Sequence, residues 1–155
     1  MTLYNKLSLT LPEGFDAISK EETPNFFGTT AMDHVFALKG KNAVIGITRP
    51  GNSLTDQEIE ERIQGYQRYY SRMAPGFVLG EMCKKTISGQ CVAFMTFKSN
   101  APTRDLYNIL AITLLDDQEV LISCSCDIQD AVTYMYPFLH VLESISFDEG
   151  EKNVI

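Results

Sequence analysis

The sequence predicts an α+β fold, in which a mostly antiparallel β-sheet of about six to eight strands packs with two main helices. Apolar segments of strand length recur along most of the chain, joined by short turns rich in Gly, Asn and Asp, which is typical of successive hairpins. One segment, 55–73, has the periodicity of an amphipathic helix. The central strands are apolar on both faces, so both faces must be covered. Together these features favour an α/β/α sandwich.

The composition is typical of one globular domain. The chain has 155 residues, of which 45% are hydrophobic and 21% charged, and its net charge is −7. We expect a single domain over residues 1–148 and a polar C-terminal tail over 149–155. A negative chain lacks the basic face that binds nucleic acid or an anionic membrane surface. No leader and no membrane-spanning segment is visible, so a cytoplasmic location is expected.

The first strands are expected in the N-terminal third of the chain. Residues 3–11 alternate Leu7, Leu9 and Leu11 with polar neighbours and close on a turn at residues 12–14. Further along, residues 34–38 and 43–48 flank the polar turn 39–42, which predicts a hairpin.

A long helix is predicted to begin at Thr55. Thr55 and Glu58 have the spacing of a capping box, in which each side chain binds the other residue's backbone amide. An apolar stripe follows at spacings of four and three, namely Ile59, Ile63, Tyr66, Tyr70 and Met73. Pro75 and Gly76 end the helix. We expect the helix to lie on an apolar surface, with its tyrosines in the core or at its edge.

Two more hairpins follow the helix. Residues 77–87 and 90–98 are expected to pair about the turn Ser88–Gly89, with Ile87 opposite Gln90. Residues 105–115 and 119–126 are expected to form the next hairpin, joined by the polar residues 116–118.

The chain is expected to close with a helix over 130–143 and a short strand over 144–147. Pro137 falls inside this helix and lacks a backbone donor. The helix therefore either starts near Tyr136, with the proline in its first turn, or is kinked. We expect His140 to be packed within it.

Residues that alternate along the central strands are apolar on both sides, as in Cys91, Ala93, Met95 and Phe97 against Val92 and Phe94. A sheet with one solvated face would alternate apolar with polar residues. Two arrangements remain open from the sequence. Either a helix covers each face, or a partner covers one of them.

The four cysteines are expected to be buried free thiols. Cys124 and Cys126 are alternate residues of one strand, about 6.5 to 7 Å apart, which is beyond comfortable bridging distance. In the expected hairpin register, Cys83 lies opposite Phe94 and not opposite Cys91. No second Cys or His cluster stands at metal-ligand spacing, so neither a metal site nor a cofactor is predicted.

No catalytic constellation is apparent either. The sequence has no phosphate-binding glycine loop and no G-x-S-x-G elbow. Only His34 and His140 are present, and a Cys126–His140 nucleophilic pair would lack an orienting group. Asp116 and Asp117 fit a hairpin turn. The sequence therefore predicts no catalytic residue and a protein that is not an enzyme.

The order of these elements resembles the PsbP-like fold over about residues 3–147. The entry Leu11-Pro12-Glu13-Gly14-Phe15 is similar to the LP-x-G-[FW] motif of that fold. The strand 43–49, the long helix, Pro75-Gly76-Phe77 and the hairpin 86–90 resemble the bacterial DcrB-like branch. The closing segment 138–147 looks like the terminal helix and S-[IF]-x-[FL] strand of the family. The chain departs from the type in lacking a Gln near the start of strand 105–115 and a lipoprotein signal with its anchoring Cys.

The resemblance implies a binding module and not an enzyme. It is strongest to cytoplasmic adaptor-chaperones that hold apolar helices of type VI secretion effectors. It therefore implies a protein partner, such as an apolar helix of a secreted effector, with a homodimer left open. Four residues are the candidates for contact with the client, namely Ile45, Ile47, Met95 and Phe97. The alternative is a small-ligand-binding or immunity-type module with a pocket between sheet and helix.

Overall fold

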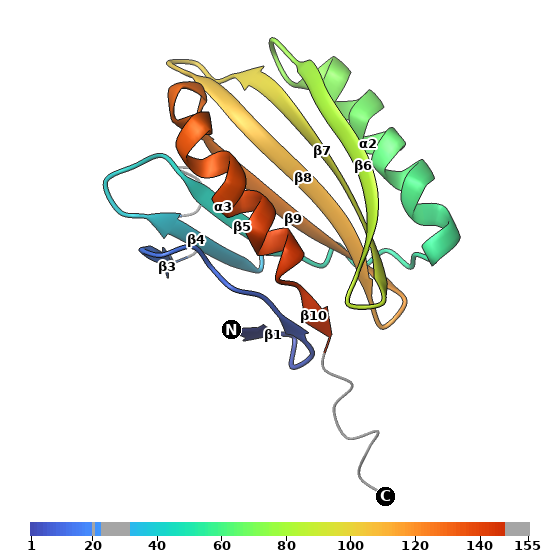
Figure 1. Cartoon of the computed structure of the whole chain (residues 1–155). Coiled ribbons are helices and arrows are strands. Elements are labelled where there is room, and N and C mark those ends of the chain that lie inside the picture. The colour runs from blue at the N-terminus through green and yellow to red at the C-terminus, as the bar shows by residue number, and fades with distance from the viewer. Residues whose placement is uncertain (20, 23–31, 148–155) are drawn as a thin grey trace, which may run out of the picture.

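The computed structural model describes residues 1–19, 21–22 and 32–147, which form two antiparallel sheets and two α-helices (Figure 1). The large sheet has the order β3-β4-β5-β9-β8-β7-β6. Its strands are β3 (Phe15–Ala17), β4 (His34–Leu38), β5 (Val44–Thr48), β6 (Val78–Ile87), β7 (Gln90–Asn100), β8 (Asp105–Leu115) and β9 (Gln118–Asp127). The small sheet has the order β1-β2-β10, with β1 (Thr2–Leu3), β2 (Leu7–Ser8) and β10 (Ser146–Phe147). The predicted α+β fold is confirmed.

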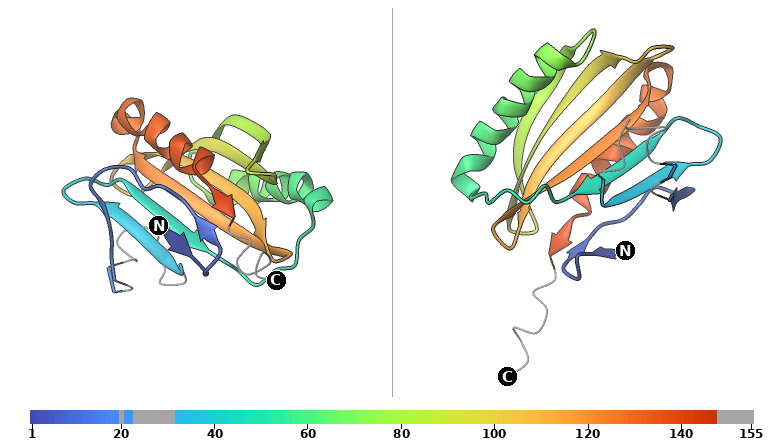
Figure 2. Two further views of the ribbon diagram at one scale, coloured as in Figure 1. Left: turned by 60° about the horizontal axis from the view of Figure 1, so that its bottom comes forward. Right: turned by 180° about the vertical axis from the view of Figure 1, so that it is seen from behind.

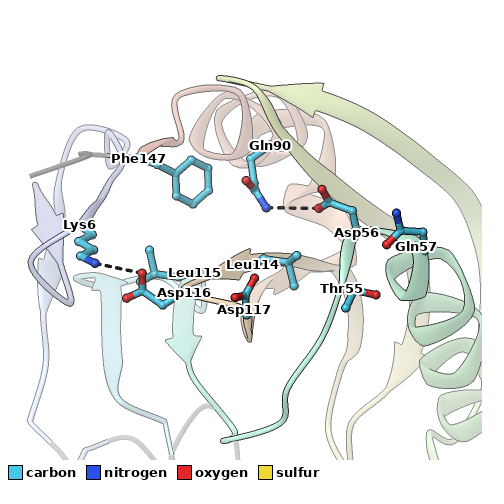
Figure 3. A pocket seen from close by; sticks show the side chains of 10 residues that line it. All are labelled: Lys6, Thr55, Asp56, Gln57, Gln90, Leu114, Leu115, Asp116, Asp117 and Phe147. Carbon is cyan, nitrogen blue, oxygen red and sulfur yellow. Dashed lines mark hydrogen bonds and ion pairs between the residues drawn. The ribbon is translucent and has the colours of Figure 1, made fainter. Parts of the chain in front are cut away.

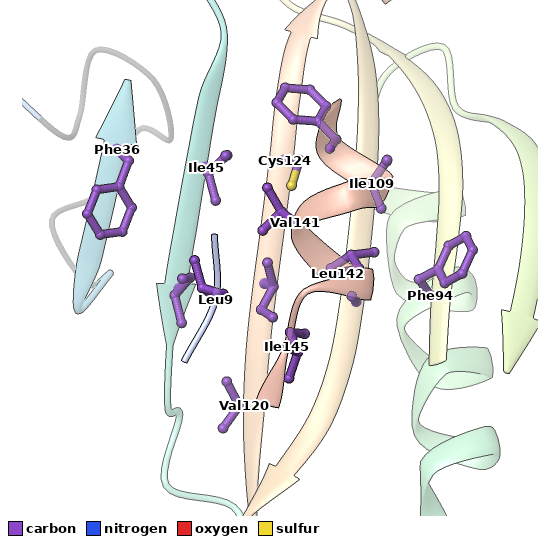
Figure 4. Close-up of a cluster of buried hydrophobic side chains, with 14 of the residues drawn as sticks. Leu9, Phe36, Ile45, Phe94, Ile109, Val120, Cys124, Val141, Leu142 and Ile145 are labelled. Atoms are coloured by element: carbon purple, nitrogen blue, oxygen red, sulfur yellow. The ribbon is translucent and has the colours of Figure 1, made fainter. Parts of the chain in front are cut away.

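The two long helices, α2 (Ile59–Met73) and α3 (Ala131–Glu143), cover opposite faces of the large sheet (Figure 2). Alternation along the strands divides the apolar side chains between the two faces. Those under α2 include Ala93, Met95, Phe97, Leu110 and Ile112. Those under α3 include Phe94, Ile109, Ile122 and Cys124 (Figure 4). Of the two arrangements open from the sequence, the chain therefore has a helix on each face.

Helix α2 starts as its sequence predicts. It is preceded by one turn of 3₁₀-helix, η1 (Asp56–Glu58), and the Thr55 amide donates to the Glu58 carboxylate at 3.0 Å in the expected capping box. Ile59 and Ile63 are buried against the sheet, as the stripe predicts. Met73, the last residue of the helix, is an exception, because its side chain is 63% exposed.

The β6–β7 hairpin has the expected register. Ile87 lies opposite Gln90 and Cys83 opposite Phe94. The predicted three-residue connection 116–118 is wrong by one residue, because Gln118 already pairs with Leu115. Asp116 and Asp117 form the two-residue turn, and both have positive φ, a conformation that Asp tolerates better than most residues.

The N-terminal strand prediction is wrong. Residues 3–11 do not form one strand, because Tyr4 and Asn5 adopt the left-handed conformation and turn the chain back, so that Leu3 pairs with Leu7. The sequence pattern also missed β3, which follows the positive-φ Gly14.

The C-terminal elements agree in part with the predictions. A short 3₁₀-helix, η2 (Ile128–Asp130), leads into α3, which begins at Ala131 and contains Pro137 in its middle. The start near Tyr136 is therefore wrong. Strand β10 is shorter than the expected 144–147. The predicted tail over 149–155 lies outside the described residues.

Candidate functional site

The four residues predicted to contact a partner are buried and do not share a surface. Ile45 and Ile47 lie in the core under α3, whereas Met95 and Phe97 lie in the core under α2. A partner would reach any of them only by displacing one of the chain's own helices. A contact between these residues and a partner stays a prediction.

The outer face of α3 carries two large apolar side chains that nothing covers within the described part of the chain, beside the polar residues Thr133, His140 and Glu143. The inner face of this helix is anchored by Phe138, Val141 and Leu142, which are buried. On the outer side, Val132 is 85% exposed and Tyr136 is 75% exposed, one helical turn apart. Their position side by side on one helix face makes them a candidate contact surface.

A groove of about 600 Å³ continues this surface toward the N-terminal segment. It runs between α3 and the turn that precedes β3. Its apolar walls come from Pro12, Tyr136, Pro137 and Leu139. Two exposed carboxylates, Glu13 and Glu143, also line it. We call Val132, Tyr136, Leu139, Pro12 and the two glutamates the α3 surface. Its chemistry suits an apolar segment that carries a basic residue.

A second hollow of about 580 Å³ lies at the end of the sheet, between the β8–β9 turn, η1 and β10 (Figure 3). Its polar side chains largely bind one another. Lys6 donates to Asp116 at 3.0 Å, and Gln90 donates to Asp56 at 3.4 Å. These contacts connect loops that are far apart in sequence, which is a structural role.

A smaller pocket of about 230 Å³ lies between the end of α2 and the sheet. Seen from behind, α2 covers one side of this sheet face and leaves β9 and part of β8 without a helix (Figure 2). Uncharged polar groups form a ladder across three strands at this place. Asn108 donates to Ser99 Oγ at 2.9 Å, and Ser125 donates to Asn108 Oδ1 at 3.0 Å. Tyr70 and Phe97 stack beside the ladder with ring centroids 5.3 Å apart.

Sequence reasoning missed a buried polar cluster under α2. Glu119 of β9 is fully buried, and its carboxylate accepts hydrogen bonds from Arg62 at 2.9 Å, Tyr66 at 2.8 Å and Asn52 at 3.0 Å. Burial, together with the bond to Glu119, raises the pKa of Tyr66 well above its usual range. Since every oxygen of the carboxylate has a donor, the cluster ties α2 to the sheet. Alternation gave no signal for it, because Glu119 stands on the face of β9 that carries Ser123 and Ser125 and not on the face of Val120 and Ile122.

The thiols and histidines do not form a nucleophilic pair. All four cysteines are free, as predicted, but Cys83 and Cys91 are half-buried and only Cys124 and Cys126 are buried. Burial raises the pKa of Cys126 to about 12, so its thiolate is disfavoured. His140 was expected to be packed, and this is wrong. It is exposed, because the helix turns Val141 and Leu142 toward the sheet instead.

Among the described residues, no group of three or more His, Cys, Asp or Glu side chains is arranged to hold a metal ion. Neither of the two α-helices in that part of the chain is long and apolar enough to cross a membrane.

No protein-family model and no curated protein matches the sequence. Solved structures are similar in fold. Cyanobacterial PsbP (CyanoP) from Synechocystis sp. PCC 6803 matches with a TM-score of 0.59 and 14% identity, over 91% of this chain and 86% of that one. LpqN, involved in cell envelope biogenesis of Mycobacterium tuberculosis, matches with a TM-score of 0.57 and 9% identity, over 92% and 83%.

A third solved structure, PA94 from Pseudomonas aeruginosa, is of unknown function. It matches with a TM-score of 0.55 and 12% identity, over 73% of this chain and 72% of that one. At such identities the likeness shows the fold alone. The chain has a PsbP-like fold.

Proposed function

We propose that this protein is a non-catalytic binding module that holds an apolar segment of a protein partner on the α3 surface. The observation that carries the proposal is the exposure of Val132 and Tyr136 on the outer face of a helix whose inner face is fully packed. In its finer form, the proposal is a cytoplasmic adaptor or chaperone of a secreted effector, of the DcrB-like branch. The sequence resemblance supports this form.

The α3 surface has the composition of a protein contact. Tyrosine is enriched among the residues that contribute most to binding, because its ring buries a large area at a small cost in side-chain entropy. Tyr136 stands at the centre of the patch, between Val132 and Leu139. Two copies of this groove would bring four carboxylates together, those of Glu13 and Glu143, with no Lys or Arg side chain of the groove to pair with them. A partner with basic residues beside its apolar ones therefore fits better than self-association of this face.

Substituting Tyr136→Glu or Val132→Lys is expected to abolish partner capture and leave the fold intact. Both side chains are exposed, so the free energy of unfolding should change by less than about 0.5 kcal/mol. The new charges would be desolvated against an apolar partner segment. The measurement is a pull-down from native extract with each variant as bait, in which recovery of the main bound protein is expected to fall at least about tenfold.

A matched control for these substitutions is Met73→Lys. Met73 is also a large apolar residue exposed on a helix, but it belongs to α2. This variant should recover the partner as the unmodified protein does. Equal recovery by Tyr136→Glu, Val132→Lys and the unmodified protein would refute binding at the α3 surface.

A second function is favoured by the pocket beside α2, namely binding of a small neutral ligand. The ladder of Ser99, Asn108 and Ser125 offers hydroxyl and amide groups, and Tyr70 offers a ring face. No charged side chain lines this pocket, so a charged ligand would be buried without a partner. A thermal-shift screen of neutral hydroxyl compounds tests this function. A compound that raises the Tm of the protein but not that of Asn108→Leu would support it, and a screen without any such compound would count against it.

A further inference from the structure

Strand β6 is a long and exposed edge of the large sheet. It has ten residues and stands last in the strand order. In the described part of the chain it pairs with β7 and with no other strand. An edge strand presents unpaired backbone donors and acceptors that can pair with another strand. The register shifts between Leu79 and Met82, which leaves Met82–Ile87 as the regular part.

The hairpin geometry fixes which backbone groups of β6 point outward. The two-residue turn Ser88–Gly89 is closed by the pair Ile87 and Gln90, and such a turn is closed by a hydrogen-bonded pair. Odd-numbered residues from Ile87 back to Cys83 therefore bond to β7. Met82, Lys84 and Thr86 direct their backbone groups away from the sheet. An added strand must pair with these even-numbered residues.

This constraint allows few antiparallel registers between two copies of β6. If the twofold axis passes through Lys84, the two Lys84 side chains, each paired with Glu60 of its own chain, face each other and no opposite-charge pair forms between the copies. If it passes through Met82, Glu81 faces Cys83 and no charges are matched. If it passes through Cys83, Glu81 of each copy faces Lys85 of the other, so that two opposite-charge pairs form.

We propose that β6 is an interface with a second copy of this chain, paired antiparallel about Cys83. Cys83 and Lys85 are alternate residues of the regular part and share one face of the sheet, whereas Glu81 lies at the register shift, where its amide donates to Thr96 Oγ1 at 2.9 Å. Glu81 and Lys85 are exposed, and the Lys85 ammonium, which lies 5.8 Å from the centroid of the Phe94 ring, would turn from this ring to the carboxylate of a second copy. Lysines at an edge discourage pairing with foreign strands. Glu81 makes this edge complementary to itself. The interface is separate from the α3 surface and does not depend on it.

The same register places the two Cys83 residues opposite each other at a pair without backbone hydrogen bonds. The Cα atoms of such a pair are about 4.5 Å apart, within the range that a disulfide spans. Cys83 is half-buried and free. The thiols thus serve as a probe of the register. Cys91 belongs to β7, one strand away from the edge, and provides the matched control.

Charge exchange tests the interface. Dimer dissociation of the full chain and its variants is measured by sedimentation equilibrium. Glu81→Lys and Lys85→Glu, each alone, place like charges opposite each other and are expected to raise the dimer Kd at least about tenfold. The double variant restores the opposite pairs, and its Kd should return to within about threefold of the unmodified value. Lys39→Glu, which makes the same change in net charge as Lys85→Glu but in the β4–β5 turn, should leave the Kd unchanged.

Cross-linking tests the register. With copper phenanthroline as oxidant, Cys91→Ser is expected to give a disulfide-linked dimer and Cys83→Ser is not. A protein that stays monomeric at about 1 mM would overturn the proposal. So would a dimer whose Kd does not respond to charge exchange, or one that does not cross-link through Cys83. None of these results bears on partner capture by the α3 surface, which the Tyr136→Glu variant tests separately.

Discussion

Replacing Phe138 by alanine is expected to lower the free energy of unfolding by about 4 kcal/mol, one of the largest losses from any single substitution in this chain. Phe138 is fully buried on the inner face of α3. Its ring meets Phe15 edge-on at 6.2 Å and stacks with Tyr134 at 6.0 Å between centroids. Truncation would remove these contacts and leave a cavity between the helix and the sheet.

Urea denaturation followed by circular dichroism measures this loss. The matched control is Tyr136→Ala, which removes an aromatic ring two residues away on the exposed side of the same helix. Its cost should be within about 0.5 kcal/mol of zero. A similar cost for both substitutions would mean that the two faces of α3 are not distinguished as the structure has them, and the α3 surface would lose its basis.

This contrast between Phe138 and Tyr136 was not predictable from the sequence. Phe138, Val141 and Leu142 are buried, but apolar residues stand almost all round this helix. Periodicity identifies a buried face only where the opposite face is polar. The sequence therefore predicted the helix. It wrongly predicted that the His140 side chain is packed, and it gave no sign that Val132 and Tyr136 would be exposed. The α3 surface follows from tertiary packing alone.

The register of the β6–β7 hairpin, in contrast, was predictable from the sequence. Ser88–Gly89 limits the turn to two residues, and that fixes the register of the whole β6–β7 ladder once the strands are identified. The apolar pattern of β7 on both faces then required a cover on each side. In residues 3–11 the side-chain alternation continues past the turn residue Asn5, and there the prediction failed. Tyr4 and Asn5 turn the chain, and neither is a glycine.

Burial of both faces of the large sheet also explains why the sequence favoured these four contact residues and why they lie in the core. Ile45 and Met95 are apolar on strands where neither face alternates with polar residues. From the sequence alone, such a residue can lie under the chain's own helix or under a partner. The choice depends on where α2 and α3 dock, which strand patterns do not specify.

A large effect is also expected where α2 meets β9. Arg62→Met should lower the free energy of unfolding by about 3 kcal/mol, because it leaves the Glu119 carboxylate buried without its cation. Glu119 is fully buried, whereas the side chain of Arg62 is 31% exposed. Water can therefore reach the arginine, but it cannot reach the Glu119 carboxylate to replace a lost cation. Tyr66 and Asn52 still donate to it, which keeps the cost at the lower end for a broken buried pair.

The exposed ion pair Lys84–Glu60 offers the control for this substitution. It also joins α2 to the sheet, at 3.2 Å, but both of its side chains are more than half exposed. Lys84→Met should cost less than about 1 kcal/mol, because water replaces the lost partner. A double-mutant cycle of Arg62→Met with Glu119→Met should show a coupling of at least about 1.5 kcal/mol. If Arg62→Met cost no more than Lys84→Met, burial of Glu119 would have no energetic consequence, and the cluster could not be what fixes α2 on the sheet.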